Sequence, residues 1–536
     1  MATVANQTPA LPQAGSLSSG AALRKVYTAW ACIALVLTLL RVIPDLNREF
    51  DYRQAWVAAD FATMARTFET TGVMELHGVP VNNNPPFGAV PPAYTHWPPL
   101  FPLLLGGWFH LFGADERSAH LLMLLLLAAT TAALFALARA CFSPIGVSIT
   151  LLAWLGTPAV VSYAHAPIHL NLCVLLMLLA NLWFLRAREP GSAVRWQVLS
   201  VAALIASILT SWEGVLLPFG WLAHAMLTRN RRERSLALRS LLAGIACAAL
   251  IVALYLAVYP QQLANLKGVL LVRLRLVDSY PVDPLNNSGS QSPLSLLGVV
   301  LFQALRTWDM LGSASLFALL LLFVEAVKTR GRFARDAFAV VALAMGGVWL
   351  VWYSVFSHHA AMHDYEALIV APLAAFAVAR LIERGWSSPG KGGAVEKGIA
   401  WAIVLPAIVA FPMAAAVYSP PKPAAADIAM VEFGREIGRL TPPGSVVLTP
   451  ECNMVPIYYS NRRIVRCVET PALLRAALDA LPGAFSPQTP VFWAVPRDTT
   501  AENRALLNTA GGHQSASLML VPLGTAAKLT LPDSVP

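Results

Sequence analysis

Charged residues are scarce in this chain of 536 residues, and their scarcity excludes an ordinary soluble protein. Asp, Glu, Lys and Arg make up 12% of the sequence and hydrophobic residues 57%, whereas soluble domains carry about 25% charged residues. Apolar runs close to the ~20 residues that cross a bilayer recur between residues 30 and 418. The composition therefore predicts a polytopic membrane protein.

Other features are also missing. Residues 1–22 are polar and contain no apolar core, so we expect a disordered, cytoplasmic N-terminus and not a signal peptide. The Lys and Arg residues behind the net charge of +9 occur in short clusters between apolar runs, which is typical of membrane topology and not of nucleic-acid binding. No internal repeat is evident, which disfavours a transporter built from repeated halves.

Cysteine is rare, with six residues in the chain. Four of them lie in or beside apolar runs and are expected to be packing residues: Cys32, Cys141, Cys173 and Cys247. Cys452 and Cys467 lie in the C-terminal region, where a disulfide and two unpaired thiols are equally compatible with the sequence.

The positive-inside rule gives the apolar runs a direction. If the short apolar segment 98–113 does not span, every later basic cluster, from Arg139 to Lys397, falls on the inner side; if it spans, all of them move outside. We therefore expect 98–113 to be a juxtamembrane or re-entrant helix, with about eleven spans, the N-terminus inside and the C-terminus outside. The expected spans are 26–44, 117–139, 145–162, 171–187, 197–212, 214–228, 239–259, 308–328, 337–356, 366–383 and 398–418.

The first outer loop, residues 45–116, is the most informative one. Asp51 follows the first span and is expected near the membrane surface. Apolar residues recur at helical spacing over 54–68, which predicts an interfacial amphipathic helix with Asp60 and Arg66 on its polar side. His96 stands in the segment THWPPL, whose aromatic residues suit the headgroup zone. Taken alone, each of these polar residues is more simply a solvated surface residue.

The remaining outer regions also carry polar residues. Glu213 lies in an outer turn near the membrane edge, where an unpaired charge is costly. Arg273 and Arg275 suit a phosphate or lipid headgroups equally well. The segment 357–366 is dense in ionisable groups and is expected to form the wall of a site, without the ligand spacing of a closed zinc site.

Several motifs between residues 50 and 186 resemble those of a known family. THWPPLFPLL at 95–104 is followed by LFGADER at 111–117, and RQA at 53–55 precedes ARTF at 65–68. These motifs are similar to those of the type C membrane glycosyltransferases, in the bacterial branch of the dolichyl-phosphate-mannose–protein mannosyltransferase superfamily. The resemblance weakens through the later spans and returns around HDY at 363–365.

The resemblance implies an inverting enzyme that moves a sugar from a polyprenyl-phosphate donor to an acceptor. In the family an outer-loop carboxylate is the general base, and basic groups or a metal hold the phosphate. Asp51 matches the base best, and Asp60 is the second choice. The residues expected to bind substrate are Arg53, Arg66, His96, His165, His169, Glu213, Arg273, Arg275, His363 and Tyr365.

The sequence also departs from the family. Many members carry a second Asp in the outer loop before the fourth span, whereas residues 163–171 read YAHAPIHLN and contain no acid. His165, His169 or Asn171 could substitute for it. Related enzymes often have a Lys near the Glu213 turn, and none is present here. The missing acid weakens any inference of a metal site, so a divalent metal cofactor stays open.

The composition changes after residue 418. Strands are predicted at 444–449, 463–468 and 490–495, helices at 427–440 and 471–481, and a short helix or turn at 454–461. Alternating strands and helices indicate a small α/β domain over 419–536, which we expect on the periplasmic side. It contains no glycine-rich phosphate loop and would cap the site or help to bind the acceptor.

Together these features predict an all-α membrane bundle of about eleven helices over residues 23–418, with juxtamembrane helices in its first outer loop and the α/β domain beyond it. We expect a glycosyltransferase of the bacterial inner membrane that takes a polyprenyl-phosphate-linked sugar as donor and a lipid, glycan or protein as acceptor. The alternatives are a non-catalytic envelope scaffold, which the missing acid favours, and a polytopic transporter.

Overall fold

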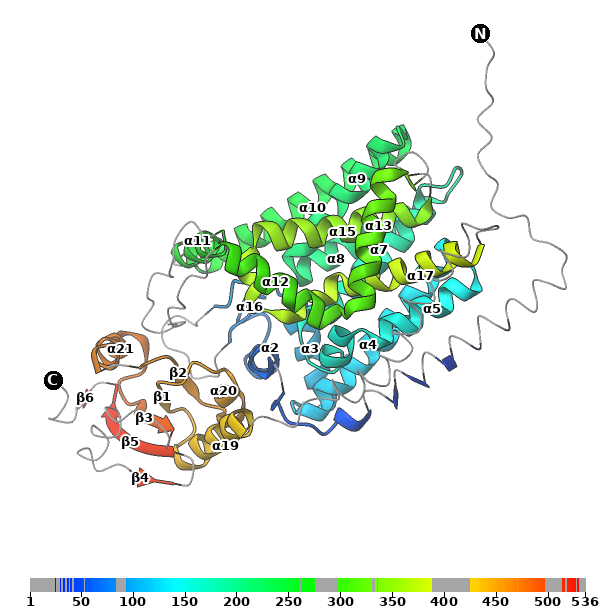
Figure 1. Ribbon diagram of the computed structural model, residues 1–536. Coiled ribbons are helices and arrows are strands. Elements are labelled where there is room, and N and C mark those ends of the chain that lie inside the picture. Colours follow the sequence, from blue (N-terminus) through cyan, green and yellow to red (C-terminus); the bar gives the residue numbers. More distant parts are fainter. Residues whose placement is uncertain are drawn as a thin grey trace, which may run out of the picture.

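The computed structural model describes residues 43–52, 54–82, 93–260, 262–274, 296–329, 333–334, 336–387, 425–469, 471–496, 513–515, 518–526 and 528–529, with scattered positions between 25 and 40. Figure 1 shows a bundle of helices and, at one end of it, a smaller domain that contains the labelled strands. The helices α2 and α3 lie at the same end of the bundle, on the side of this domain.

Four described helices are long and apolar enough to cross a membrane: α4 (Glu116–Cys141), α7 (His169–Ala187), α10 (Arg231–Val258) and α15 (Ala337–Val355). α7 is largely buried inside the bundle, whereas α10 leaves most of its apolar surface exposed, as a helix in contact with lipid does. Further helices cover other expected spans: α5 (Pro144–Gly156), α8 (Val194–Thr210), α9 (Leu217–Leu227) and α17 (Ala371–Ser387). The chain is a multi-pass membrane protein, and the number of eleven spans stays a prediction.

Two of the expected spans are interrupted. The span 145–162 is divided at Thr157, where Pro158 begins the short helix α6 (Pro158–Tyr163), because proline has no N–H for the preceding turn. The span 308–328 is divided at Gly312, which has a φ of 77°. There the last residues of α12 (Leu296–Leu311) meet α13 (Ser313–Lys328) at 111°. The expected spans 26–44 and 398–418 lie mainly outside the described residues.

The first outer loop forms two helices that pack on each other, α2 (Ala55–Thr71) and α3 (Leu100–Phe112). The 13 residues of α3 extend about 20 Å, less than the ~30 Å core of a bilayer. Where the two helices meet, a Cβ on Gly106 would lie 2.9 Å from the carbonyl oxygen of Ala65, so only glycine permits this approach. The segment 98–113 is therefore too short to cross a membrane by itself.

Short elements connect the ends of the long helices on this side of the bundle. They are η1 (Ile43–Asp45), η2 (Trp212–Leu216), α11 (Gln262–Arg273), α16 (Ser357–Met362) and η3 (Asp364–Ile369). The rings of His363, in the turn between α16 and η3, and of Trp56 of α2 lie 5.5 Å apart, so these elements bring distant parts of the sequence together beside α2.

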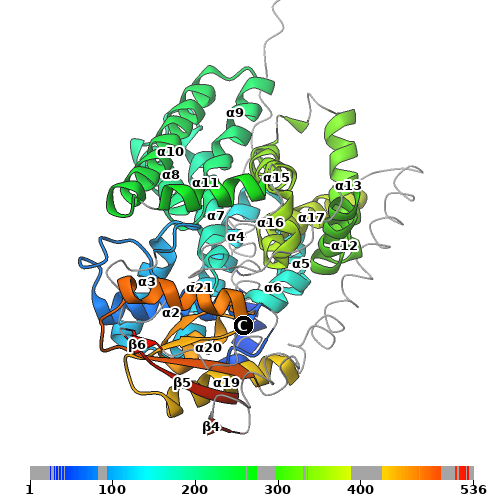
Figure 2. The same cartoon turned by 90° about the vertical axis from the view of Figure 1, so that its left-hand side faces the viewer.

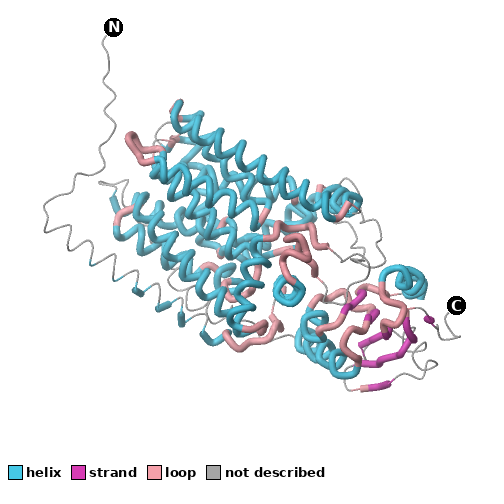
Figure 3. The backbone as a smooth tube through the Cα atoms, turned by 180° about the vertical axis from the view of Figure 1, so that it is seen from behind, coloured by secondary structure: helices cyan, strands magenta, loops and turns pink. Residues whose placement is uncertain are grey.

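The C-terminal domain has a six-stranded sheet with the order β2-β1-β3-β5-β4, in which β6 also pairs with β5. The strands β1 (Val446–Leu448), β2 (Arg463–Val465) and β3 (Pro490–Pro496) are parallel, whereas β5 (Leu518–Thr525) runs antiparallel to β3. The short strands β4 (His513–Gln514) and β6 (Lys528–Leu529) complete the sheet. Figure 3 shows these strands confined to one region of the chain.

Helices cover both faces of this sheet. Val446 and Leu448 belong to one apolar cluster with residues of α21 (Pro471–Ala484). Val447, between them, belongs to another cluster with residues of α19 (Ala425–Leu440) and α20 (Val455–Ser460). Because successive side chains of a strand point to opposite faces, these buried strands require a layer on each side.

Candidate active site

A layer of buried polar side chains lies where the bundle meets α2 and α3. It is assembled from four segments that are far apart in the sequence, and this gathering is the first mark of a site. The members are at most 5% exposed: Asp45, His165, His169, Glu213, His359, Asp364 and Glu366. Burial of so many ionisable groups is costly unless each has partners or a function.

Asp51 is next to this layer, in the segment that leads from η1 into α2. Its carboxylate oxygen Oδ1 accepts a hydrogen bond of 2.8 Å from Nε of Arg48, and its side chain is 14% exposed. Arg48 also lies 3.9 Å from Asp45 Oδ1. Asp51 therefore combines a defined position with access to solvent, which a general base requires.

Asp45 joins this segment to the buried layer. Its Oδ2 lies 3.9 Å from Nδ1 of His165, whose ring in turn packs on Tyr52 with a centroid distance of 4.7 Å. Sequence reasoning took Asp51 as the first acid after the first span and overlooked Asp45. The signal was available, because Asp45 precedes Asp51 by six positions in the same outer segment.

His169 lies deeper, among aromatic rings from α2 and the segment before α3. Its ring centroid is 4.3 Å from that of Trp97 and 5.1 Å from that of Phe61. Trp97 also contacts the ring of His359, which is 3.0 Å from Glu366 Oε1 through its Nε2. The THWPPL segment therefore connects two of the histidine-bearing outer loops.

The segment 357–366 contributes His359, Asp364 and Glu366 to the buried polar layer. Tyr163 donates a hydrogen bond of 2.5 Å to Asp364 Oδ1, and its ring contacts that of Tyr365. His363 packs between the rings of Tyr365 and Trp56 of α2, at 5.1 and 5.5 Å. His363 and Tyr365, both expected to bind substrate, thus lie beside α2.

Asp60, the second choice for the base, is buried on α2 and faces the C-terminal domain. Burial raises its pKa to about 7, against the opposing effects of the Arg466 guanidinium and of a hydrogen bond with Asn82. Arg466 also donates a hydrogen bond of 2.6 Å to the carbonyl oxygen of Cys452. Asp60 is consequently part of the contact between the two domains.

Arg66 has contacts that favour a structural role over the expected contact with substrate. Its guanidinium donates to the carbonyl oxygens of Tyr458 and Ala114, at 2.8 and 3.1 Å, and lies 4.0 Å from the centroid of the Tyr458 ring. The sequence showed a cation on the polar face of α2 but not that another domain would cover that face.

Three further expected residues have mainly local contacts. The carbonyl oxygen of His96 accepts a hydrogen bond of 2.8 Å from Trp212 Nε1, so this residue links the first outer loop to η2. Glu213 is fully buried and accepts a hydrogen bond from the Ser211 hydroxyl. The side-chain amide of Asn171 donates hydrogen bonds of 3.0 and 2.9 Å to the carbonyl oxygens of residues 163 and 166, and it thereby stabilises its own loop.

Some expected residues lie outside what the structure describes. Arg53 and Arg275 are among the residues without a described placement, and Arg273 ends α11 without a described side chain. Their assignment to substrate binding stays a prediction.

The sequence and the fold were compared with known proteins. Residues 96–257 match the family model described as dolichyl-phosphate-mannose-protein mannosyltransferase. This segment is similar to the type C membrane glycosyltransferases of that superfamily. No curated protein matches the sequence.

Solved structures share the fold over almost the whole chain. ArnT from Cupriavidus metallidurans in the apo state is 14% identical, with 95% of this chain and 98% of that one covered and a TM-score of 0.59. The same protein bound to undecaprenyl phosphate is 15% identical, with the same coverage and a TM-score of 0.58. The oligosaccharyltransferase AglB from Archaeoglobus fulgidus, in complex with an inhibitory peptide and a dolichol-phosphate, is 13% identical with a TM-score of 0.55. The match with AglB covers 88% of this chain and 69% of the AglB chain.

The acidic residues of the buried layer come mainly from other segments than the loop 163–171. The loop 163–171 lacks the second acid, but Asp364 places a carboxylate against Tyr163 of the adjacent α6. Among the described residues, no group of three or more His, Cys, Asp or Glu side chains is arranged to hold a metal ion.

Proposed function

We propose that this glycosyltransferase moves a sugar from a polyprenyl-phosphate donor to a lipid, glycan or protein acceptor, with inversion at the anomeric carbon. The family match supports the class of reaction. The undecaprenyl phosphate and dolichol-phosphate bound by two proteins of the same fold support the class of donor. We also propose that transfer occurs on the periplasmic side of the bacterial inner membrane, to which the positive-inside rule assigns the first outer loop.

The observation that carries the proposal is the position of Asp51. Its carboxylate is partly exposed, is bonded to Arg48 and adjoins a buried layer of histidines and acids. A sugar on a lipid phosphate already has a good leaving group, so the remaining demand is to deprotonate the acceptor. Asp51 would take the proton of the acceptor hydroxyl or amine while that oxygen or nitrogen attacks the anomeric carbon.

The bond that breaks joins the anomeric carbon to the phosphate oxygen, and the polyprenyl phosphate leaves with both electrons. A cation near the phosphate stabilises this departing charge. Arg48, bonded to Asp51 at 2.8 Å, is the nearest described guanidinium to the base and is proposed to approach the phosphate. Attack from the face opposite to the phosphate gives inversion.

The experiment measures sugar transfer by purified protein in lipid nanodiscs, with native membrane extract as the source of acceptors. The donors are undecaprenyl-phosphate-linked mannose, glucose, galactose and arabinose, each radiolabelled. We expect transfer from one of them by the wild type and a loss of at least a hundredfold for Asp51→Asn, because general-base catalysis contributes about 10²- to 10⁴-fold.

Asp60→Asn is the matched variant on the neighbouring helix and should retain transfer. Equal activity of Asp51→Asn and wild type, with loss in Asp60→Asn, would assign the base to Asp60. The absence of transfer from every donor would favour the scaffold or the transporter.

A further inference from the structure

The residue before Asp51 is held by the C-terminal domain. The backbone N–H of Phe50 donates a hydrogen bond of 2.9 Å to the hydroxyl oxygen of Tyr459, which lies more than 400 positions later in the chain. The Phe50 side chain is fully buried, and its ring is 4.9 and 6.4 Å from the rings of Tyr458 and Tyr459. Both tyrosines belong to α20.

Tyr459 connects three parts of the molecule through one hydroxyl. It accepts from Phe50 in the first outer segment and is hydrogen-bonded to Glu116, in the first turn of α4. Burial raises the pKa of Tyr459 well above its ordinary value, so the hydroxyl keeps its proton for Glu116 at every physiological pH. The hydroxyl thus acts as acceptor and donor at once.

A second contact holds the residue before Phe50. Arg435 of α19 forms an ion pair with Glu49, and its guanidinium lies 5.2 Å from the centroid of the Tyr459 ring. Both side chains of the pair are about 40% exposed, so this pair by itself contributes little to stability. The ion pair instead restrains the backbone at Glu49, two residues before Asp51.

The contacts of residues 49 and 50 with the C-terminal domain also restrain Asp51, because the three residues are consecutive in the backbone. The N–H of Asp51 donates to the carbonyl oxygen of Glu49 at 2.8 Å, so residues 49 to 51 form a tight turn. The Asp51 carboxylate is bonded to Arg48, which belongs to the same segment and moves with it. The contacts of residues 49 and 50 with α19 and α20 therefore determine where the carboxylate lies relative to the bundle.

We propose that Tyr459 of the C-terminal domain is a positioning residue for Asp51, so that the docked domain completes the active site. This inference rests on the proposed function and assigns the C-terminal domain a part in the reaction. A carboxylate displaced by about 1 Å can lose on the order of a hundredfold in rate, which makes one hydrogen bond to its neighbour consequential.

The chain provides a matched control for Tyr459→Phe. Tyr458 is adjacent, packs on the same Phe50 ring, and places its hydroxyl 3.5 Å from the carbonyl oxygen of Ala114, away from the Asp51 segment. Tyr458→Phe and Tyr459→Phe each remove one hydroxyl and keep the ring. The full-length variants are compared in lipid nanodiscs.

Two measurements are made on each variant. Hydrogen–deuterium exchange of the peptide containing Phe50 should become about fivefold faster in Tyr459→Phe, since one hydrogen bond is lost, and should not change in Tyr458→Phe. With the donor that the wild type uses, kcat of Tyr459→Phe should fall about tenfold while KM for the donor stays within about twofold. If Tyr459 had only a structural role, the Tyr459→Phe variant would yield less folded protein, without a fall in kcat at an unchanged KM.

Each outcome decides something. Unchanged exchange at Phe50, or equal losses of kcat in both variants, overturns the positioning role even if Asp51→Asn has no activity. If the wild type transfers sugar from none of the four donors, the proposed function fails and the positioning role fails with it. Faster exchange would then establish only that the domain is docked through Tyr459.

Discussion

Asp51 and Asp60 differ by nine positions in the sequence but have different surroundings. Asp51 is partly exposed and adjoins the histidine-rich layer, whereas Asp60 is buried against Asn82 and Arg466. From the sequence both were acids of one outer loop, because helical periodicity gives the face of a residue but not what covers that face. The different surroundings therefore make Asp51 the candidate base and Asp60 a buried acid at the contact between the two domains.

The buried carboxyl of Asp60 predicts a stability that falls as pH rises. Its folded pKa is about 7 against an ordinary 3.8, so between these values the folded state holds a proton that the unfolded chain has lost. Stability is therefore highest below pH ~4 and declines up to pH ~7, by on the order of 4 kcal/mol at most. Asp60→Asn should flatten this decline, measured as the thermal unfolding midpoint between pH 4.5 and 8.

Arg466 faces the same carboxyl and remains charged over the whole range, so it adds no slope of its own. A slope that persists in Asp60→Asn would contradict the assignment.

Helix contacts determine the architecture at the scale of elements. The helices α9 and α15 approach so closely that a Cβ on Gly220 would lie 2.3 Å from the Cα of Ala344 and 2.4 Å from the carbonyl oxygen of Leu343. Small residues allow this kind of contact between membrane helices. The apolar pattern predicted both helices, but it could not show that they pair, because apolar residues surround each helix on every side.

Gly220→Ala should weaken the α9–α15 contact. The methyl group would meet backbone atoms that cannot move aside, and we expect a loss of about 1–3 kcal/mol, as for overpacked cores. The measurement is the thermal unfolding midpoint in detergent. Gly347→Ala is the matched control on α15, because a Cβ there meets nothing within 4 Å. Equal midpoints for Gly220→Ala and Gly347→Ala would show that this contact relaxes freely.

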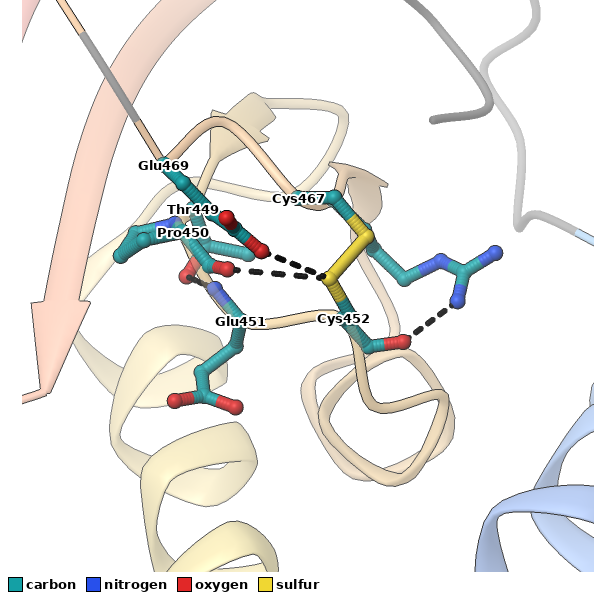
Figure 4. The surroundings of a disulfide bond; sticks show 7 residues. Thr449, Pro450, Glu451, Cys452, Cys467 and Glu469 are labelled. Atoms are coloured by element: carbon teal, nitrogen blue, oxygen red, sulfur yellow. Dashed lines mark hydrogen bonds between the residues drawn. A yellow bond between two sulfur atoms is a disulfide. The ribbon is translucent and has the colours of Figure 1, made fainter. Parts of the chain in front are cut away.

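At the scale of the whole molecule, a disulfide lies next to the helix through which the C-terminal domain contacts the bundle. Cys452 and Cys467, left open by the sequence, form a disulfide that closes a loop containing α20, the helix of Tyr458 and Tyr459. Figure 4 shows this bond with Glu469 beside it. Disulfides persist in oxidising compartments, so the bond supports the expected outer position of the C-terminal domain.

Selective labelling of cysteines in spheroplasts tests on which side of the membrane the C-terminal domain lies. We expect the Cys452 and Cys467 thiols to react with a membrane-impermeant maleimide only after treatment with a membrane-impermeant reductant, because the domain faces outward and the thiols are paired. A double variant, Cys452→Ser with Cys467→Ser, should lose the signal. Labelling that requires permeabilised membranes would place the domain inside and reverse the topology.

The sequence by itself determined the membrane class, the resemblance to a family and most helices, because scarcity of charge, apolar runs and motif order are local properties. It also indicated that segment 357–366 is dense in ionisable groups, and its part in a site stays a prediction. Only the tertiary structure decided that Asp364 supplies a carboxylate beside Tyr163, that Arg66 is covered by Tyr458, and that Tyr459 reaches Phe50. These contacts join residues about 200 to 400 positions apart, and no periodicity or motif specifies which distant surfaces meet when helices and domains pack.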